Sequence, residues 1–265
     1  MNAHPTLNGA WIGSKRGGRF SAVEGKLREA GFTRACAVAL PGVGGYDRKA
    51  FISAANASPD FWVPVAAWES RTWTPDGVRR EIETIHALGY KAVKLHPRLF
   101  GRMPTASELS LLIREADQAT LPLFVCSYPF GVPSSEVRGD LLSILSSAME
   151  CAPQAKIVLL HAGCVDFLRF VEFARAISGI VLDLSFTMMK YEASSIDIDL
   201  RFAFRTFDER LCLGSDYPEF DPQQVRQRFQ SICEASGIDD KRRDNIASRN
   251  AHRLFGIHSP GDRSP

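Results

Sequence analysis

The sequence predicts a single (β/α)8 barrel of the TIM type, in the α/β class, and three observations support that prediction. Short runs rich in Val, Leu, Ile and Ala recur without polar alternation, as in strands buried on both faces of a parallel sheet. Amphipathic helical stretches lie between these runs. Strand and helix alternate about eight times over about 250 residues, which is the size and order of such a barrel.

The N-terminal segment is the first strand candidate, and seven apolar runs follow it. These runs are 34–40, 61–68, 91–97, 122–128, 156–163, 179–185 and 211–218. A doubly wound open sheet is the structural alternative, but no glycine-rich phosphate loop follows the first strand. The stretch PGVGG (41–45) after the second run lacks the G-x-G-x-x-G spacing, so we interpret it as a flexible loop.

Three helical stretches carry start signals that fix where they begin. The stretches are 74–89, 105–119 and 221–235. Thr105 with Glu108 three residues later forms the pattern of a capping box. Asp221 followed by Pro222 places a cap and then a proline at the first helical position.

The composition indicates one large globular domain, which we place at 1–257. Of the 265 residues 45% are hydrophobic and 23% charged, and the net charge of +2 is too small to indicate nucleic acid or a membrane surface as partner. The six cysteines are scattered and typical of reduced thiols, and no secretory signal is visible, so a cytoplasmic location is expected. The tail 258–265 is predicted to be disordered.

Polar residues gather at the predicted strand ends, which is where barrel proteins carry their function. Three of the six histidines fall at such ends, namely His4, His96 and His161. The other polar or reactive residues at these ends are Thr6, Trp68, Glu69, Lys94, Arg98, Cys126, Ser127, Tyr128, Cys164, Asp183, Ser185, Ser215, Asp216 and Tyr217. The sequence therefore predicts a site at the C-terminal end of the barrel.

Five short motifs carry a family resemblance. They are AVKLHP (92–97), VLLHAG (158–163), VLDLS (181–185), LGSDYP (213–218) and NAHRLFG (250–256). In this order and spacing the chain resembles the amidohydrolase superfamily over roughly residues 2–256. The most similar branch is the amidohydrolase-2 group, which contains the aminocarboxymuconate-semialdehyde decarboxylases and the lactone hydrolases.

The resemblance also implies a metal site, but this chain departs from it at two positions. That family begins with Asp-Ala-His-x-His, and here His4 matches the first histidine while Thr6 replaces the second. Cys126 stands where the family has a strand-five histidine, whereas His161 and Asp216 match the strand-six and strand-eight residues. We therefore favour no metal and no cofactor; Zn²⁺ is the alternative, with His4, Cys126, His161 and Asp216 as ligands.

The function expected from these residues is metal-independent hydrolysis of a small carbonyl compound, a lactone, amide or ester that can carry a carboxylate. Asp216 would act as general base, and His161 and His96 would polarise the carbonyl. The residues expected to bind the substrate are Lys94, Arg98, Tyr128 and Trp68.

Several alternatives stay open at this point. A zinc-dependent amidohydrolase or nonoxidative decarboxylase would use the same pocket, and a catalytically silent barrel would bind a ligand or partner there. Cys126 activated by His161 is a conceivable nucleophile, although a buried cysteine is usually a small hydrophobe. Asp216 could instead cap a turn, and His161 could be a satisfied core histidine. The identity of the substrate and the oligomeric state stay open.

Overall fold

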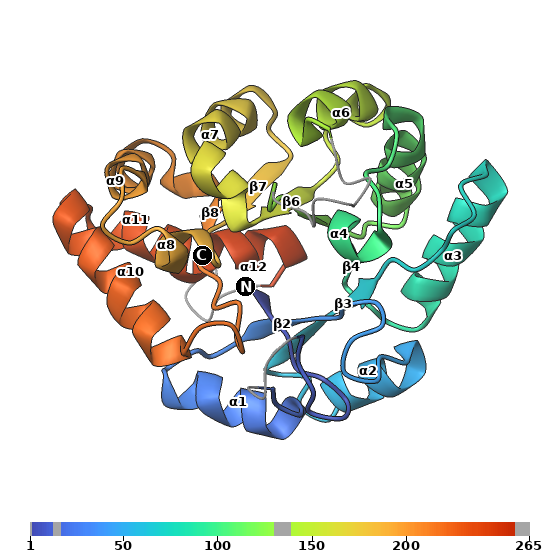
Figure 1. Cartoon of the computed structure of the whole chain (residues 1–265), viewed down its shortest axis with the longest axis horizontal. Coiled ribbons are helices and arrows are strands. Elements are labelled where there is room, and N and C mark those ends of the chain that lie inside the picture. Colours follow the sequence, from blue (N-terminus) through green and yellow to red (C-terminus); the bar gives the residue numbers. More distant parts are fainter. Residues whose placement is uncertain (1, 13–16, 130–138, 258–265) are drawn as a thin grey trace, which may run out of the picture.

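The computed structural model describes residues 2–12, 17–129 and 139–257. Its centre is one eight-stranded parallel sheet in which each strand pairs with the next one along the chain, from β1 to β8. The strands are β1 (Asn2–Ala3), β2 (Ala35–Val38), β3 (Trp62–Ala67), β4 (Ala92–Leu95), β5 (Leu123–Cys126), β6 (Ile157–Leu160), β7 (Ile180–Asp183) and β8 (Leu211–Cys212). The sheet curls and the helices surround it, which confirms the predicted barrel class (Figure 1).

Helices follow every strand from β1 to β8. The longer ones are α1 (Phe20–Glu29), α2 (Arg48–Ala55), α3 (Pro75–Ala87), α5 (Ala106–Gln118), α6 (Leu141–Ala148), α7 (Phe167–Ala176), α9 (Ile196–Thr206) and α10 (Pro222–Ser236). The shorter ones are α4 (Pro97–Phe100), α8 (Thr187–Lys190), α11 (Asp240–Asp244), α12 (Asn250–Phe255), the 3-10 helices η1 (Met149–Cys151), η2 (His161–Asp166) and η3 (Asp208–Arg210), and the π-helix η4 (Asn245–Arg249). The predicted tail 258–265 lies outside the described residues.

The predicted helix starts are confirmed. The Thr105 hydroxyl accepts from the Glu108 amide at 3.2 Å, and the Glu108 carboxylate accepts from the Thr105 amide at 2.9 Å, so the capping box is complete. The Asp221 carboxylate likewise accepts from the Gln223 amide at 2.9 Å at the start of α10. Among the described residues no helix is long and apolar enough to cross a membrane.

The first and last strands meet at the C-terminal end of the barrel. The carbonyl of Asn2 accepts hydrogen bonds from the amides of Ser215 at 3.1 Å and Asp216 at 2.8 Å. The amide of His4 in turn donates to the carbonyl of Tyr217 at 2.8 Å. These bonds hold residues 2–4 against the segment that follows β8. Residues more than two hundred positions apart in the sequence are therefore neighbours at the barrel mouth.

The register of the strands decides which side chains face the barrel interior. Lys94 on β4 pairs with Phe124 on β5, and Cys126 pairs with Leu160 on β6. Phe124 and Leu160 belong to the apolar cluster that fills the interior, whereas Val125 packs in the larger cluster between sheet and helices. Because alternate residues of a strand share a face, Lys94 and Cys126 also point inward.

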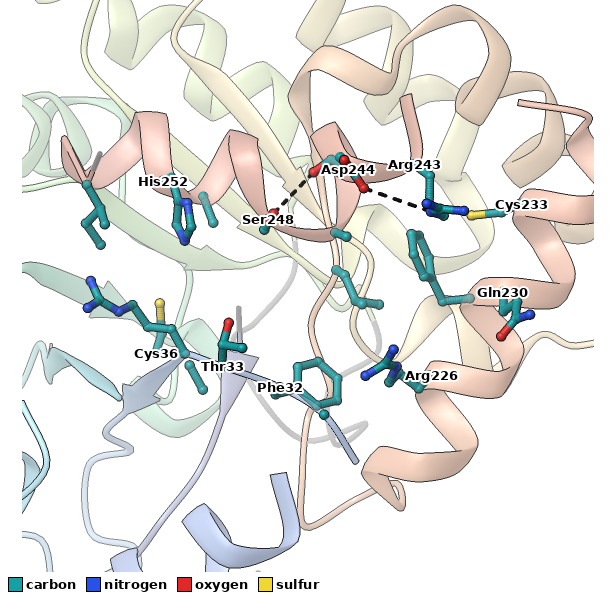
Figure 2. Close-up of a pocket in the computed structure, with 18 of the residues that line it drawn as sticks. Phe32, Thr33, Cys36, Arg226, Gln230, Cys233, Arg243, Asp244, Ser248 and His252 are labelled. Carbon is teal, nitrogen blue, oxygen red and sulfur yellow. Dashed lines mark hydrogen bonds and ion pairs between the residues drawn. The ribbon is translucent and has the colours of Figure 1, made fainter. Parts of the chain in front are cut away.

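A hollow of about 820 Å³ lies at the N-terminal end of the strands, between β2, α10, η4 and α12. Figure 2 shows Cys36 and Thr33 on one side of it, Arg226 and Gln230 on α10, and His252 opposite. This hollow lies at the end of the barrel opposite to the predicted site, because Phe32, Thr33 and Arg34, which line it, precede the first residue of β2.

Candidate active site

The backbone is strained at the C-terminal ends of β6, β7 and β8. Five of the seven described non-glycine residues with positive φ lie there: His161 (68°), Ala162 (44°), Cys164 (57°), Phe186 (67°) and Asp216 (53°). Residues other than glycine rarely adopt this conformation, which costs on the order of 1–3 kcal/mol each. Such clusters occur at functional sites, where the strain aims a side chain that regular alternation would point elsewhere.

His161 is turned into the site by this left-handed backbone. Leu160 before it faces inward, so a regular strand would point the next side chain outward toward the helices. The ring Nδ1 lies 3.2 Å from the carbonyl of Ser185, to which it donates, so the lone pair of the neutral ring is on Nε2. The Ser127 hydroxyl holds the turn, because it accepts from the Gly163 amide at 2.9 Å and donates to the Leu160 carbonyl at 2.6 Å.

Asp216 contacts Asn2 of β1 and His4, which follows β1. The side-chain amide of Asn2 donates to Asp216 Oδ1 at 2.8 Å, and His4 Nε2 is 3.3 Å from the same oxygen. The other ring nitrogen of His4, Nδ1, donates to the Val38 carbonyl at 2.7 Å, so the neutral ring directs an acceptor nitrogen at Asp216. Burial and the nearby Lys94 lower the pKa of His4 to about 4, which keeps this ring neutral at pH 7.

Two opposite charges face each other across the site. Burial opposes ionisation of Asp216, but the positive charge of His161, the largest of the opposing interactions, holds the pKa of Asp216 well below its usual range. Burial likewise opposes protonation of His161, but Asp216 and Cys126 raise the pKa of His161 to about 9. At neutral pH the site therefore holds an Asp216 carboxylate and a His161 imidazolium.

Cys126 ends β5 between two histidines. Leu95 pairs with Val125 and Cys126 pairs with Leu160, so His96 and His161 follow on the strands at either side. Burial opposes ionisation of the thiol, but interactions with His96 and His161 on the neighbouring strands bring the pKa of Cys126 well below its usual value. The Leu99 amide donates to His96 Nδ1 at 3.3 Å, so the neutral His96 ring carries its proton on Nε2.

Lys94 lies inside the same cluster and is only 1% exposed. Burial lowers the pKa of Lys94, while Cys126, Asp216 and Asp183 favour its charged form. Asp183 is also fully buried; its Oδ1 accepts from the Ser185 amide at 3.0 Å. A Cβ atom at position 214 would lie 2.5 Å from Asp183 Oδ2, so only glycine fits at that position.

The structure thus brings together most of the residues proposed from the sequence. His4, Lys94, His96, Cys126, His161 and Asp216 are all buried at the C-terminal end of the barrel. Arg98 lies at the exposed rim, where its guanidinium stands 4.4 Å above the ring of Tyr128. Trp68 is 1% exposed and packs on Trp73 with ring centroids 5.4 Å apart, so it supports the wall of the barrel mouth.

Three residues that the sequence reasoning left without a role also shape the site. Asn2 positions Asp216, Ser185 accepts from His161 through its carbonyl, and Ser127 fixes the turn at Gly163. Asn2 lies two residues before His4 on the first strand, so shared strand face was the signal that could have identified it. For Ser127 and Ser185 the only signal in the sequence is that each follows a buried apolar run, which does not indicate what either residue contacts.

A metal ion is implied by the family resemblance, so we tested the donor set against it. His4 Nε2 and Asp216 Oδ1 converge, but the Thr6 hydroxyl donates to the Gly18 carbonyl at 3.4 Å. Within residues 2–12, 17–129 and 139–257 no group of three or more His, Cys, Asp or Glu side chains is arranged to hold a metal ion. Since catalytic zinc takes three protein ligands, the arrangement of the described donors does not fit one.

The fold and this cluster define an α/β barrel with a candidate active site at the C-terminal ends of its strands. The chain belongs to the amidohydrolase family of the amidohydrolase-2 type, because that family's model matches residues 19–257. No curated protein matches the sequence.

Solved structures with the same fold share little sequence with the chain. An uncharacterized TIM-barrel protein from Bordetella bronchiseptica has 17% identity, a TM-score of 0.73, and coverage of 88% of this chain and 81% of that one. A 5-carboxyvanillate decarboxylase from Sphingomonas paucimobilis has 14% identity, a TM-score of 0.63 and coverage of 88% and 82%. A second, from Novosphingobium aromaticivorans with manganese and a nitrobenzoic acid bound, has 14% identity, a TM-score of 0.61 and coverage of 88% and 78%.

Proposed function

We propose that this protein hydrolyses a small carbonyl compound, a lactone, ester or amide, without a metal ion. The observation that carries the proposal is the facing pair of acceptors, His4 Nε2 and Asp216 Oδ1, 3.3 Å apart and next to the imidazolium of His161. A water molecule held by two such acceptors presents its oxygen to a substrate carbonyl. Asp216 takes the proton as that oxygen attacks.

The low pKa of Asp216 makes it a weak base in the resting site, and the coupling to His161 changes this during the reaction. Among the interactions that favour the Asp216 carboxylate, the charge of His161 is the largest. When His161 gives its proton to the leaving oxygen or nitrogen, that charge disappears and Asp216 becomes a stronger base. The two transfers therefore assist each other, as coupled acid and base catalysis requires.

The cluster also supplies donors for the carbonyl oxygen. His161 and the Nε2–H of His96 are oriented by their other ring nitrogens, and Lys94 is held nearby in a buried setting. Each preorganised donor contributes a few kcal/mol when water is excluded, about 2.7–4 kcal/mol in a measured case. Arg98 at the rim is the residue we assign to a substrate carboxylate, since a guanidinium pairs with it in bidentate geometry.

A zinc-dependent hydrolase or nonoxidative decarboxylase is the second candidate, favoured by the convergence of His4 and Asp216 alone. Two related decarboxylase structures contain manganese and a nitrobenzoic acid ligand. Elemental analysis of the purified protein separates the two versions of the site. We expect clearly less than one equivalent of transition metal, and stoichiometric zinc or manganese that resists dialysis would favour the metal-dependent version.

The test of the proposed function is turnover of a panel of lactones, esters and amides, each with and without a carboxylate. We expect turnover of at least one class and its loss in Asp216→Asn, which keeps the size of the side chain but cannot accept the proton. Asp221→Asn is the matched control, because Asn caps a helix as well as Asp. A panel without turnover favours a silent barrel, and activity of Asp216→Asn within about threefold of wild type, less than 1 kcal/mol, removes Asp216 as the base.

A further inference from the structure

The hollow at the N-terminal end of the strands has no part in the proposed function. Its volume of about 820 Å³ lies within the range of small-molecule pockets, which measure about 300–1,000 Å³. Three parts of the chain surround it: the loop before β2, α10 with the turn after it, and the segment from η4 to α12 (Figure 2). The hollow is therefore large enough to hold a ligand of its own.

The inner part of the hollow is apolar and carries aromatic rings. Cys36 and Val63 line it from the strands, and both belong to the apolar cluster that fills the barrel interior. Phe32, Phe229 and Phe255 line it from the loop before β2, from α10 and from α12. Phe32 and Phe255 are only half-buried, so a ligand would cover ring surface that is now exposed. Because aromatic rings pair favourably in stacked and edge-to-face geometry, this lining favours a ligand with an aromatic body.

The charges that line the hollow do not cancel. Three arginines and two acidic residues contribute to the lining, namely Arg34, Arg226, Arg243, Glu234 and Asp244. Asp244 Oδ1 lies 3.9 Å from Arg243 Nε, and the Glu234 carboxylate accepts from a side-chain amide at 3.0 Å. In the part of the chain that the structure describes, no carboxylate forms an ion pair with Arg34 or Arg226. Two cationic side chains are thus left for an anion.

Arg226 is held at the edge of the hollow by the backbone opposite to it. From α10 its Nη1 donates to the carbonyl of Ala30 at 3.0 Å. A Cβ atom at Gly31 would lie 1.9 Å from the same nitrogen, so the guanidinium rests directly on the loop before β2. Figure 2 shows the side chain of Arg226 directed toward Phe32. Among the described residues this is its one hydrogen bond, which leaves Nε and Nη2 for a carboxylate in bidentate geometry.

We propose that the hollow binds a small carboxylate with an aromatic body, its ring against the phenylalanines and its carboxylate on Arg226. The site does not depend on the proposed function, since it lies at the other end of the barrel. A neutral apolar molecule would leave the arginines without an ionic partner, and a small polar anion such as phosphate would leave the rings uncovered. Arg34 adds to the positive potential of the same lining.

The experiment is isothermal titration calorimetry of the whole chain with 2-naphthoate, and with 2-naphthamide as an uncharged probe of nearly the same shape. We expect 2-naphthoate to bind with a Kd below about 1 mM and 2-naphthamide to bind at least about fivefold more weakly. Arg226→Gln should weaken 2-naphthoate at least about fivefold and leave 2-naphthamide unchanged. Arg205→Gln is the matched control, because it removes the same charge from an exposed position of α9 outside the hollow.

Hydrogen exchange locates the bound probe without any variant. We expect 2-naphthoate to slow amide exchange in peptides that cover 30–36 and 237–252, on either side of the hollow. Slowing that is confined to the proposed active site, in peptides covering 157–166 and 213–218, overturns the proposal. Binding of 2-naphthoate that is lost in Arg98→Gln and kept in Arg226→Gln overturns it as well, since the carboxylate would then lie at the C-terminal end.

The remaining outcomes also decide the question. No heat from 2-naphthoate at about 1 mM with the folded wild type contradicts the proposed site, and equal binding of the two probes removes the carboxylate from Arg226. Sedimentation tests another occupant: a dimer that Arg226→Gln dissociates would assign the hollow to a second copy of the chain. None of these measurements uses turnover, so a panel without hydrolysis leaves this proposal standing, and its failure leaves the proposed function unaffected.

Discussion

The two ends of the barrel interior differ in what surrounds the same kinds of residue. At the C-terminal end, titratable side chains are buried against one another on strained backbone, with Cys126, His161 and Asp216 in one cluster. At the N-terminal end, the hollow of about 820 Å³ is lined by Cys36 and His252 and by the ion pair of Arg243 and Asp244 (Figure 2). The proposed site and the hollow therefore differ in the chemistry of their side chains, and the volume of the hollow does not make it the better candidate.

The cysteines make the comparison sharpest. Burial raises the pKa of Cys36 to about 12 and also raises that of Cys212, although both thiols face the same barrel interior as Cys126. Burial acts on Cys126 in the same direction, but His96 and His161 outweigh it. The difference teaches that neighbouring side chains, placed by strand register, decide the direction in which the pKa of a buried thiol moves here, and residue type and burial alone do not.

The largest expected effect comes from replacing one histidine at each end of the barrel by glutamine. We expect His161→Gln to lower kcat/KM on the panel substrate by about 10²–10⁴-fold, the range for losing a general acid. His252→Gln, in the lining of the N-terminal hollow, should leave kcat/KM within about twofold. Steady-state kinetics on both variants, with circular dichroism as a folding control, measures this; equal losses would remove the distinction between the ends.

The second largest expected effect is a difference in alkylation rate between Cys126 at the C-terminal end and Cys36 in the lining of the N-terminal hollow. With iodoacetamide at pH 7, Cys126 should be alkylated at least about 100-fold faster than Cys36, since the thiolate is the reacting form. The pKa of Cys36 near 12 leaves almost no thiolate at this pH, whereas the pKa of Cys126 lies well below its usual value. Peptide mass spectrometry over time gives both rates in one sample. Similar rates for the two cysteines would contradict the electrostatic difference.

The pH dependence tests the charge at the reactive end. The pKa of His161 is raised to about 9, so the acid form of this side chain persists below that pH and is lost above it. We expect kcat/KM to be level from pH 7 to about 8.5 and to fall about tenfold per pH unit beyond 9. The remaining activity of His161→Gln should lack this decline. A decline near pH 6.5 in wild type would mean that Asp216 and Cys126 do not raise the pKa.

Part of this arrangement was predictable from the sequence. Apolar runs and helix caps such as Thr105 with Glu108 identified the barrel, and the strand-end motifs identified His161 and Asp216 as residues of one site. The pairing of Asn2 with Asp216 was not predictable, because it depends on how the first strand meets the segment after the last. The left-handed backbone at His161 also has no sequence signal, since the usual indicator of positive φ is glycine.

The setting of Cys126 shows where sequence reasoning ends. Its position after an apolar run was compatible with a metal ligand, a nucleophile or a packed thiol. The choice depends on the pairing of β4, β5 and β6, which sets His96 and His161 at its two sides. Register is determined by the packing of the whole sheet, and a shift of one residue would turn Cys126 away from both rings.

The smallest expected effect compares two glycines with similar backbone, one at each end. Gly163 (φ 75°) lies in the turn after β6, and Gly237 (φ 62°) lines the N-terminal hollow after α10. An alanine methyl at 163 would lie 2.1 Å from the Phe170 ring, whereas at 237 it would meet nothing within 4 Å. Gly237→Ala should therefore cost only the left-handed backbone, about 1–2 kcal/mol, while Gly163→Ala adds an overpacking cost of about 1–3 kcal/mol.

Thermal unfolding of the two variants measures that difference directly. Both carry the same chemical change at the same kind of backbone, so the effect on the unfolded chain cancels in the comparison. For a domain of this size 1 kcal/mol corresponds to about 2–4 °C in Tm, and Gly163→Ala should melt below Gly237→Ala by at least that amount. The Gly163 amide also donates to Ser127 Oγ in the turn that aims His161, so Gly163→Ala should lose activity as well as stability. If both variants melt together and keep full activity, the turn after β6 is not the rigid support of the site that its contacts with Ser127 and Phe170 indicate.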